Sequence, residues 1–405
     1  MKLRKGIKYL PFIVKMLVAF ILSKTIFRHY YENQTWLIGE KKTEARDNGY
    51  HLFKYIRQNH PKIKAYYVIT KDSPDAHKVN KYGNVINCYS MKHYLLFLTS
   101  KNFIHSQQPS KNGTFPLWLS LTKLLPFLIN KQQNLIFLKH GIHYNNMGNS
   151  LDYQKTKYSI ISCASEREKH FIMDTYGYPD EKALLLGLCR FDNLHNVEKF
   201  TKKQILIMPT FRSWLRTKDR TIEASSHEQE SFKSSRYFKT YIELLNNDKL
   251  HKALEKYDYE VIFYPHYSMQ SYINVFKKSI KKNRVRIADR YNYDVQELLI
   301  NSALMITDFS SVFFDFAYMK KPLIYFQFDS EKFRKKHYKK GYFSYNDDGF
   351  GPVLENSEQV IEEIEQKLKN NLEVEQKYLS RINGFFTVRD SNNCKRTFEA
   401  IKQLS

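Results

Sequence analysis

The chain is poor in cysteine, and the few cysteines it has are widely spaced. Its 405 residues contain four, at positions 88, 163, 189 and 394, and no two of them form a Cys-x-x-Cys pair. Cys88 and Cys163 lie inside apolar, strand-like runs, so we expect buried free thiols rather than disulfides or a metal site. This usage fits a reducing compartment, and we expect the cytoplasm.

Long hydrophobic runs are also absent. The apolar stretch at residues 9–22 is interrupted by Pro11 and Lys15, is too short to span a bilayer, and is followed by no small-x-small cleavage site. Residues 1–31 are therefore predicted to be an amphipathic membrane-surface segment or, alternatively, a helix packed on the first domain. In the membrane reading, the basic residues Lys2, Arg4, Lys5 and Lys8 meet headgroups, and Phe12, Leu17, Phe20 and Ile21 enter the acyl boundary. A second apolar stretch at residues 115–129 is compatible with lipid contact or with a core.

Acidic residues are outnumbered, with Asp and Glu at 41 against Lys and Arg at 65, which gives a formal charge of +24. Such a charge attracts polyanions: nucleic acid, an acidic membrane face or a phosphate-rich substrate. No RNP-like, KH-like or zinc-finger spacing is present, so a nucleic-acid-binding protein is the weaker alternative. A compositional bias of the source genome also explains a distributed basic charge.

Short apolar runs rich in Ile, Val and Tyr alternate with helical patterns, which is typical of parallel α/β layers. Strands are predicted at residues 36–38, 65–69, 85–88, 102–105, 135–138, 159–163 and 183–186, and in a second series beginning at Gln204. We expect two Rossmann-like domains, at 32–195 and 203–385, followed by a C-terminal helix at 386–405. A cleft between two such domains is the expected active site. The polar segment 212–236 is predicted to be a long loop, either a lid or a surface insertion.

The run ALMITDFSSVFFD at residues 303–315 is typical of a phosphate-binding turn. A strand leads into Thr307, Asp308, Ser310 and Ser311, and a helix is predicted to begin near Val312. Its first N–H groups and the two hydroxyls would converge on an anion at the carboxyl edge of the sheet. An ordinary N-cap is an equally simple reading of the turn alone.

Two histidines follow predicted strands, one in each half of the chain. His140 precedes Gly141, which would let the backbone turn or approach a ligand, and His266 follows Pro265. Near pH 7 an imidazole accepts a proton or, when charged, pairs with phosphate. A metal site at His140 and His143 is not favoured, because no Asp, Glu or Cys lies at ligand spacing nearby.

Arg190 and Arg212 also lie at the ends of predicted strands, where guanidinium groups clamp phosphate bidentately. The alternative is a surface ion pair, with Asp192 as the partner of Arg190. Thr210 ends the strand before Arg212, and Glu297 is placed to accept hydrogen bonds from a ribose or polyol hydroxyl, although a generic helix carboxylate needs no such role.

The ordered motifs resemble the CDP-glycerol glycerophosphotransferase family, which makes teichoic-acid and related polymers. They are His140-Gly141, GLCRFD from 187, PTFR from 209, YPH from 264, DVQELL from 294, TDFSSVFFD from 307 to Asp315, and KPLIYFQFD from 321. The resemblance covers roughly residues 100–355. Lys139 stands where many members have Trp, Phe211 replaces the Trp of PTWR, and Cys189 replaces a proline, which affects acceptor identity more than reaction type.

This resemblance implies a GT-B fold and transfer of glycerol phosphate or ribitol phosphate from CDP-glycerol or CDP-ribitol. The acceptor would be a hydroxyl of a lipid-linked or polymeric molecule, CMP would be released, and the enzyme would work at the inner face of the membrane. By the same resemblance, His140 and His266 match the two histidines needed for activity. Ser310 and Ser311 match the residues at the donor pyrophosphate. Arg190 and Arg212 match basic positions of the family motifs. No metal site is predicted, although a phosphate-bridging Mg²⁺ held by few protein ligands would leave little trace in the sequence. A GT-B glycosyltransferase using a nucleotide sugar is the main alternative.

Overall fold

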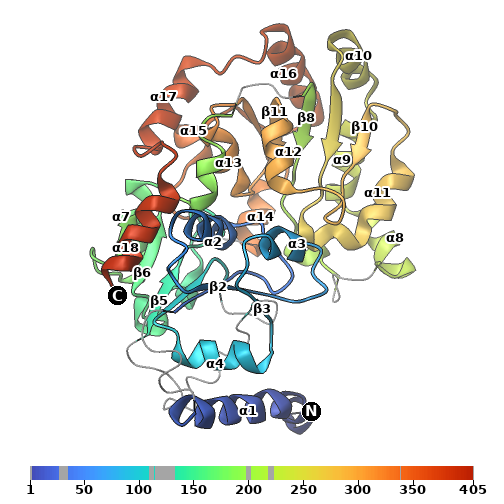
Figure 1. Cartoon of the computed structure of the whole chain (residues 1–405). Coiled ribbons are helices and arrows are strands. Elements are labelled where there is room, and N and C mark those ends of the chain that lie inside the picture. Colours follow the sequence, from blue (N-terminus) through green and yellow to red (C-terminus); the bar gives the residue numbers. More distant parts are fainter. Residues whose placement is uncertain are drawn as a thin grey trace. The chain divides into compact units, whose positions relative to one another are not determined.

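The computed structural model describes residues 2–26, 35–108, 114, 133–197, 202–217, 223–337 and 339–404, with the backbone alone for residues 2–10. The chain forms two compact α/β units (Figure 1). The first comprises residues 1–142, 149–192 and 390–405, and the second residues 143–148 and 193–389. Helix α18, which follows the second unit in sequence, thus belongs to the first.

The first unit is built on a seven-stranded, wholly parallel sheet in the order β3-β2-β1-β4-β5-β6-β7. Its strands are β1 (Trp36–Gly39), β2 (Ala65–Ile69), β3 (Val85–Asn87), β4 (Asn102–His105), β5 (Asn134–Phe137), β6 (Ile160–Cys163) and β7 (Ala183–Leu185). Every predicted strand of the first half is confirmed. These short runs are mostly apolar because a parallel sheet is covered on both faces.

Helices lie on both faces of this sheet, over two separate apolar cores. They are α1 (Lys2–Lys24), α2 (Asn48–Asn59), α3 (Ala76–Asn80), α4 (Met91–Thr99), α6 (Tyr153–Thr156), α7 (Glu166–Tyr176) and α18 (Asn393–Gln403), with 3-10 turns η2 (Gly148–Ser150) and η3 (Cys189–Asn193). Helix α7 begins where the Ser165 hydroxyl accepts from the Glu168 N–H and ends at Gly177, whose φ is +69°.

The second unit has a six-stranded parallel sheet in the order β10-β9-β8-β11-β12-β13. Its strands are β8 (Gln204–Ile207), β9 (Glu260–Phe263), β10 (Val285–Ile287), β11 (Leu304–Thr307), β12 (Leu323–Phe326) and β13 (Val353–Leu354). Its α-helices are α8 (Ser226–Ser234), α9 (Arg236–Asn246), α10 (Asp248–Tyr257), α11 (Ile273–Ser279), α12 (Val295–Asn301), α13 (Val312–Tyr318), α14 (Ser330–Lys336), α15 (Tyr345–Asp348), α16 (Ser357–Lys369) and α17 (Gln376–Phe385). Two 3-10 turns, η4 (Ser213–Leu215) and η5 (Tyr267–Tyr272), follow β8 and β9.

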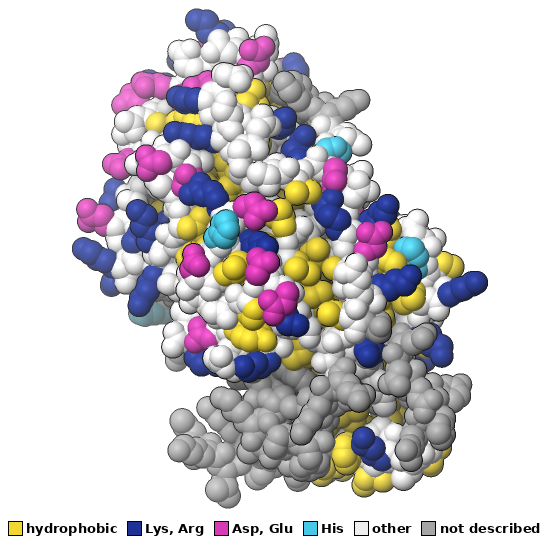
Figure 2. All heavy atoms as spheres, turned by 90° about the vertical axis from the view of Figure 1, so that its left-hand side faces the viewer, with side chains coloured by type: hydrophobic (Ala, Val, Ile, Leu, Met, Phe, Trp, Pro, Cys, Tyr) yellow, Lys and Arg dark blue, Asp and Glu magenta, His cyan; other side chains and the backbone are white. Residues whose placement is uncertain are grey.

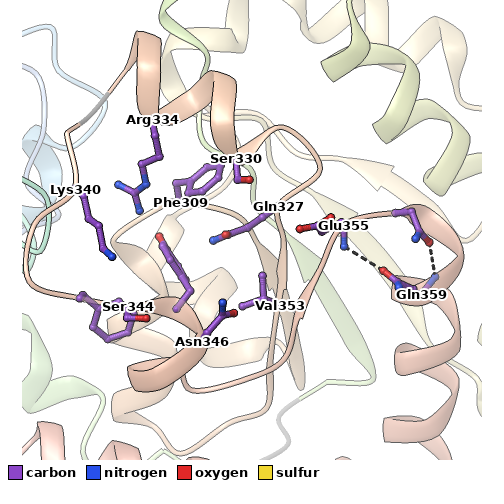
Figure 3. Close-up of a pocket in the computed structure, with 13 residues that line it drawn as sticks. Phe309, Gln327, Ser330, Arg334, Lys340, Ser344, Asn346, Val353, Glu355 and Gln359 are labelled. Atoms are coloured by element: carbon purple, nitrogen blue, oxygen red, sulfur yellow. Dashed lines mark hydrogen bonds between the residues drawn. The ribbon is translucent and has the colours of Figure 1, made fainter.

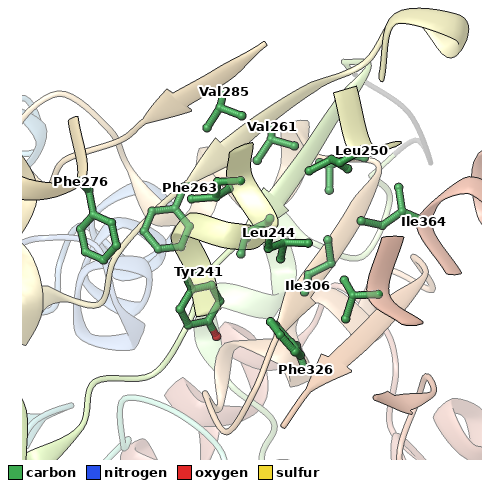
Figure 4. Close-up of a cluster of buried hydrophobic side chains, with 14 of the residues drawn as sticks. Tyr241, Leu244, Leu250, Val261, Phe263, Phe276, Val285, Ile306, Phe326 and Ile364 are labelled. Carbon is green, nitrogen blue, oxygen red and sulfur yellow. The ribbon is translucent and has the colours of Figure 1, made fainter. Parts of the chain in front are cut away.

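One large apolar core holds the second sheet to its helices (Figure 4). The ring of Tyr241 on α9 lies 5.5 Å from that of Phe263 on β9 and 5.8 Å from that of Phe326 on β12. Ile364 of α16 is also fully buried in this cluster. Full burial of each such aliphatic side chain stabilises the fold by about 1.5–3 kcal/mol. The prediction of two Rossmann-like α/β domains is therefore confirmed at the level of fold class.

The prediction of an unbroken loop at 212–236 is wrong for the part that the structure describes. Helix α8 begins at a capping box, in which the Ser225 hydroxyl accepts from the Glu228 N–H and the Glu228 carboxylate accepts from the Ser225 N–H. Local capping stabilises this polar helix, which carries little apolar periodicity. The apolar stretch 115–129 lies outside the described residues.

All four cysteines are buried free thiols, as predicted. In the described residues, no helix has both the length and the apolar character needed to cross a bilayer. On the face drawn in Figure 2, the described Lys and Arg side chains are scattered among Asp and Glu rather than gathered in one patch.

Candidate active site

His140 follows β5 in the first unit, and its backbone is held from two sides. The carbonyl oxygen of His140 accepts from the Arg190 guanidinium at 3.1 Å, and that of Lys139 accepts from the Asn48 side-chain amide at 2.8 Å. Lys139 adopts φ +59°, a conformation that favours glycine, whereas Gly141 is not among the residues with positive φ. The left-handed residue of the turn that presents His140 is therefore Lys139 and not Gly141, and the alternative that Gly141 lets the backbone approach a ligand stays a prediction.

His140 as a whole residue is exposed to solvent, yet the protein around its imidazole displaces part of the hydration of the ring. This desolvation lowers the pKa of His140 from its ordinary value; Asp47 opposes the shift, while Lys41 and Arg190 add to it. The imidazole is consequently neutral near pH 7 and able to accept a proton.

Arg190 pairs with Asp47 and not with Asp192. Its guanidinium lies 2.8 Å from the Asp47 carboxylate, and its backbone N–H donates to the Asn48 side chain at 3.1 Å. Asp192 instead accepts from the Asn393 and Cys394 N–H groups at 2.7 and 2.9 Å, which ties η3 to the start of α18. Asp192 is thus engaged within the fold of the first unit.

Beside the His140 turn, Lys139 forms a wholly buried ion pair with Glu168 of α7. The second Glu168 carboxylate oxygen accepts from the Ala164 N–H at 2.8 Å. Two charges without solvent are maintained only when both are paired and hydrogen-bonded. The buried pair with Glu168 therefore anchors Lys139, and with it the turn that precedes His140, to the interior of the first unit.

His266 follows β9 in the second unit. Its Nδ1 accepts from the Ser268 N–H at 3.1 Å, and its ring stacks on Phe211 with centroids 4.7 Å apart. Because Nδ1 is the acceptor in this contact, the neutral ring carries its proton on Nε2. His266 is thus oriented as an N–H donor.

The turn after β11 combines buried and open polar groups. The Thr307 hydroxyl donates to the Met208 carbonyl at 2.7 Å, and Asp308 accepts from the Thr210 N–H at 2.8 Å. Ser310 and Ser311 are half-buried, and their hydroxyls make no hydrogen bond to any residue that the structure describes. The two serines are therefore the groups in this turn that are available to a ligand.

Arg212 lies inside the second unit with no exposed side-chain surface. Its guanidinium binds the Asp329 carboxylate bidentately at 2.8 and 2.7 Å, and lies 2.9 Å from Asp308. Burial disfavours the charged form, but Asp308 and Asp329 outweigh it and raise the pKa of Arg212. In this geometry Arg212 supports the turn after β11 rather than touching a ligand.

The other predicted site residues differ in exposure. Asp315 is buried in α13, Glu297 is exposed on the first turn of α12, and Gly141 is buried. Thr210 is buried, and its hydroxyl has no partner among the described residues. In that part of the chain, no group of three His, Cys, Asp or Glu side chains is arranged to hold a metal ion.

Sequence reasoning missed Asp47, and it quoted Gln327 and Asp329 within the motif KPLIYFQFD without giving either residue a role. Asp47 caps α2, and the Asp-Asn-Gly at 47–49 before an apolar-periodic run is a signal for such a cap. Asp329 and Gln327 directly follow β12, so the strand-end argument applied to His140 would have found them too.

Two parallel α/β units with polar groups beyond the strand ends define a protein of the GT-B-like class. Among solved structures, the wall teichoic acid polymerase TagF matches with a TM-score of 0.69 at 16% identity, covering 100% of this chain and 98% of that one. UDP-GlcNAc 2-epimerase from Neisseria meningitidis matches with a TM-score of 0.53 at 11% identity, covering 91% and 99%. At these identities the likeness shows the fold alone.

The sequence profile of the CDP-Glycerol:Poly(glycerophosphate) glycerophosphotransferase family matches residues 21–403, and the chain belongs to this family. Among curated relatives, the minor teichoic acid biosynthesis protein GgaB of Bacillus subtilis (strain 168) is 35% identical over 382 residues, covering 94% of this chain and 41% of GgaB. The teichoic acid poly(glycerol phosphate) polymerase of the same strain is 26% identical over 339 residues, covering 78% and 41%. The chain thus spans about two fifths of the length of these relatives.

Proposed function

We propose that the chain transfers a polyol phosphate, either glycerol phosphate or ribitol phosphate, from a CDP-polyol to an acceptor hydroxyl and releases CMP. The observation that carries the proposal is the pair of histidines at strand ends: His140 is accessible and neutral, and His266 presents its Nε2–H.

In the proposed reaction the acceptor oxygen bonds to the β-phosphorus of the donor. The bond from that phosphorus to the bridging oxygen breaks, and the oxygen leaves with CMP. His140 takes the acceptor proton, because its lowered pKa keeps it unprotonated at neutral pH. His266 donates a hydrogen bond from Nε2 to the diphosphate of the donor. The hydroxyls of Ser310 and Ser311 hydrogen-bond to oxygens of the same diphosphate.

The two arginines act in this scheme by positioning other groups. Arg190 holds the carbonyl oxygen of His140, and Arg212 holds Asp308, which in turn accepts from the Thr210 N–H. Both guanidinium charges are balanced by carboxylates, with Asp47 beside Arg190 and with Asp308 and Asp329 beside Arg212, so the two arginines act through position rather than through net charge.

The names of two relatives support either CDP-glycerol or CDP-ribitol as the proposed donor. One is named a poly(glycerol phosphate) polymerase and another, from Bacillus spizizenii, a poly(ribitol-phosphate) polymerase. A TagF variant was also soaked with CDPG. These names suggest a polyol-phosphate polymer as the acceptor, and we propose a lipid-linked chain of this kind.

The test is incubation with CDP-glycerol or CDP-ribitol and candidate lipid-linked acceptors, scored for CMP release. His140→Ala is expected to abolish turnover while CDP-polyol binding, measured by calorimetry, stays within about twofold of the wild type. His170→Ala, which changes another first-unit histidine outside the proposed site, is the matched control and should retain turnover. An active His140→Ala enzyme would refute the role of the base.

We also propose that the chain binds the inner membrane surface through α1. This helix packs against α4 with Met16 and Ala19 buried, which is the alternative that the sequence left open. Phe12 and Phe20 are partly buried in the same cluster, so the prediction that they enter lipid is revised.

A second face of α1 remains exposed. Val14, Leu17, Val18 and Ile21 are 51%, 38%, 41% and 61% exposed and are spaced as one stripe of a helix. Such a stripe on a basic helix suits an anionic bilayer, where each buried apolar side chain contributes about 1.5–3 kcal/mol.

Flotation with vesicles containing anionic lipid tests this proposal. In the double variant Leu17→Asn, Ile21→Asn, vesicle binding should weaken at least about tenfold, because two apolar side chains that would enter the bilayer are replaced by polar ones. Tyr291→Asn, which changes a 66% exposed aromatic of the second unit, is the control and should float like the wild type. Equal flotation of all three proteins would contradict membrane binding through α1.

A further inference from the structure

A cavity of about 510 Å³ opens in the second unit beyond the carboxyl ends of β11, β12 and β13 (Figure 3). Phe309 follows β11, Gln327 follows β12, and Glu355 follows β13, so three strand ends contribute to its lining. Arg334 and Lys340 reach it from α14 and the segment after it. This volume falls in the range of small-molecule sites.

Two cations line the cavity without an ion-pair partner among the described residues. Lys340 makes no polar contact with any of them, and Arg334 uses one nitrogen on the Asn145 amide oxygen at 2.7 Å. In Figure 3, Arg334 and Lys340 point towards the same space as Gln327. Cations so placed are available to an anion, and a guanidinium beside an ammonium suits the oxygens of a phosphate.

Most of the remaining lining residues are polar, and all of these except Glu355 are uncharged. Gln327 donates to the Asp308 carbonyl at 3.0 Å, while its side-chain oxygen accepts from no described residue. Ser330, Asn356 and Gln359 add hydroxyl and amide groups, and Glu355 adds one carboxylate. Such groups hydrogen-bond to the hydroxyls of a polyol.

The aromatic residues of the cavity have no free face for a nucleobase. Phe309, Phe343 and Tyr345 are 2%, 1% and 7% exposed. Phe309 already stacks on Phe333 with ring centroids 3.9 Å apart. The accessible walls are therefore the polar side chains, which favours a phosphate with attached hydroxyls over a base.

The cavity adjoins the proposed diphosphate site through the chain itself. Phe309 directly precedes Ser310 and Ser311, and Gln327 holds the carbonyl of Asp308. A ligand in the cavity therefore contacts the loop that carries the two serines.

We infer that this cavity binds a polyol-phosphate unit, with the phosphate at Arg334 and Lys340 and the hydroxyls at Gln327 and its polar neighbours. The inference rests on the proposed function for the origin of the ligand, which is either a unit of the acceptor chain or the polyol phosphate of the donor. Both share the same chemistry.

The test compares Lys340→Gln with Lys335→Gln. Both remove an exposed lysine charge, but Lys335 is not among the residues that line this cavity. The Michaelis constants for CDP-glycerol and for a synthetic glycerol-phosphate oligomer are measured by CMP release. Lys340→Gln is expected to raise one of them about five- to tenfold, while Lys335→Gln leaves both unchanged. A rise for the oligomer assigns the cavity to the acceptor chain, and a rise for CDP-glycerol assigns it to the donor.

Direct binding separates this inference from the proposed function. Glycerophosphoglycerol is titrated calorimetrically into the wild type and both variants, with glycerol and inorganic phosphate as reference ligands. Binding that is lost in Lys340→Gln alone supports the cavity even if every CDP-polyol proves inactive. The inference is overturned if glycerophosphoglycerol binds all three proteins equally, binds none, or binds no better than inorganic phosphate.

Discussion

The buried ion pair between Lys139 and Glu168 gives the sharpest stability prediction. In Lys139→Met the ammonium is lost, and the Glu168 carboxylate remains in a site without solvent, with the Ala164 N–H still donating to it at 2.8 Å. Removing one partner of a buried pair costs about 3–5 kcal/mol, a large part of a typical unfolding free energy of about 5–15 kcal/mol. The single variant should therefore be severely destabilised in its first unit.

Restoring neutrality should recover most of that loss. In Lys139→Met, Glu168→Gln the side-chain oxygen still accepts from Ala164, and no unpaired charge remains buried. We expect the double variant to lie within about 2 kcal/mol of the wild type. Lys169→Met is the matched control: it alters an adjacent lysine whose partner Asp180 is 71% exposed, and should cost less than about 1 kcal/mol.

Hydrogen exchange of β5 and β6 peptides across a urea series provides the assay. It follows the first unit alone, which matters because a chain of two units need not unfold in one step. A Lys139→Met protein within about 1 kcal/mol of the wild type would refute the role of the buried pair, and so would a double variant no more stable than the single one.

Three further predictions concern a carboxyl, a glycine and an arginine pair. Burial, and to a smaller extent the nearby Asp47, raises the pKa of Glu40 from the ordinary 4.5 to about 8, so the folded state holds one proton more than the unfolded state between these pH values. The unfolding free energy should therefore fall by up to about 1.4 kcal/mol per pH unit as the pH rises from 4.5 to 8. Glu40→Gln should show a flatter dependence of the urea midpoint on pH, and parallel profiles for the two proteins would contradict this. Gly187 has φ +77°, and a Cβ there would lie 1.7 Å from the Asn393 side-chain oxygen. Gly187→Ala should therefore weaken the hydrogen-exchange protection of α18 by more than about 1 kcal/mol. Unchanged protection would show that the contact relaxes. Asp329→Asn removes one of the two carboxylates that pair with Arg212, while Asp308 remains 2.9 Å from the guanidinium. The variant should cost about 1–3 kcal/mol in the second unit and lower CMP release as well, whereas normal stability and turnover would show that the pair does not hold the turn after β11.

The strands were predicted well from the sequence, because each is a short, mostly apolar run of the kind that a doubly covered parallel sheet requires. It missed β13, a strand of two residues whose apolar run is too short to recognise. It also missed α8, where capping groups rather than periodicity define the helix. Both failures concern elements with little apolar signal.

For the site, the strand-end argument identified His140, His266 and the turn after β11. It did not foresee that Arg212 is buried, since the partner that buries it, Asp329, lies 117 residues further along the chain. It also offered Gly141 as the residue that lets the backbone turn or approach a ligand, whereas the left-handed conformation lies at Lys139, whose carbonyl oxygen accepts from the Asn48 side chain. The local residue pattern shows which polar side chains follow a strand, but it does not show which of them form ion pairs with residues far away in the chain.

Product analysis tests the central proposal most directly. The protein is incubated with CDP-glycerol or CDP-ribitol and a lipid-linked polyol-phosphate acceptor, and all products are weighed by mass spectrometry. Polyol-phosphate transfer predicts CMP together with acceptor masses increased by whole glycerol-phosphate or ribitol-phosphate units. Release of a nucleoside diphosphate from a nucleotide sugar, with neither CDP-polyol consumed, would contradict it and favour a glycosyltransferase.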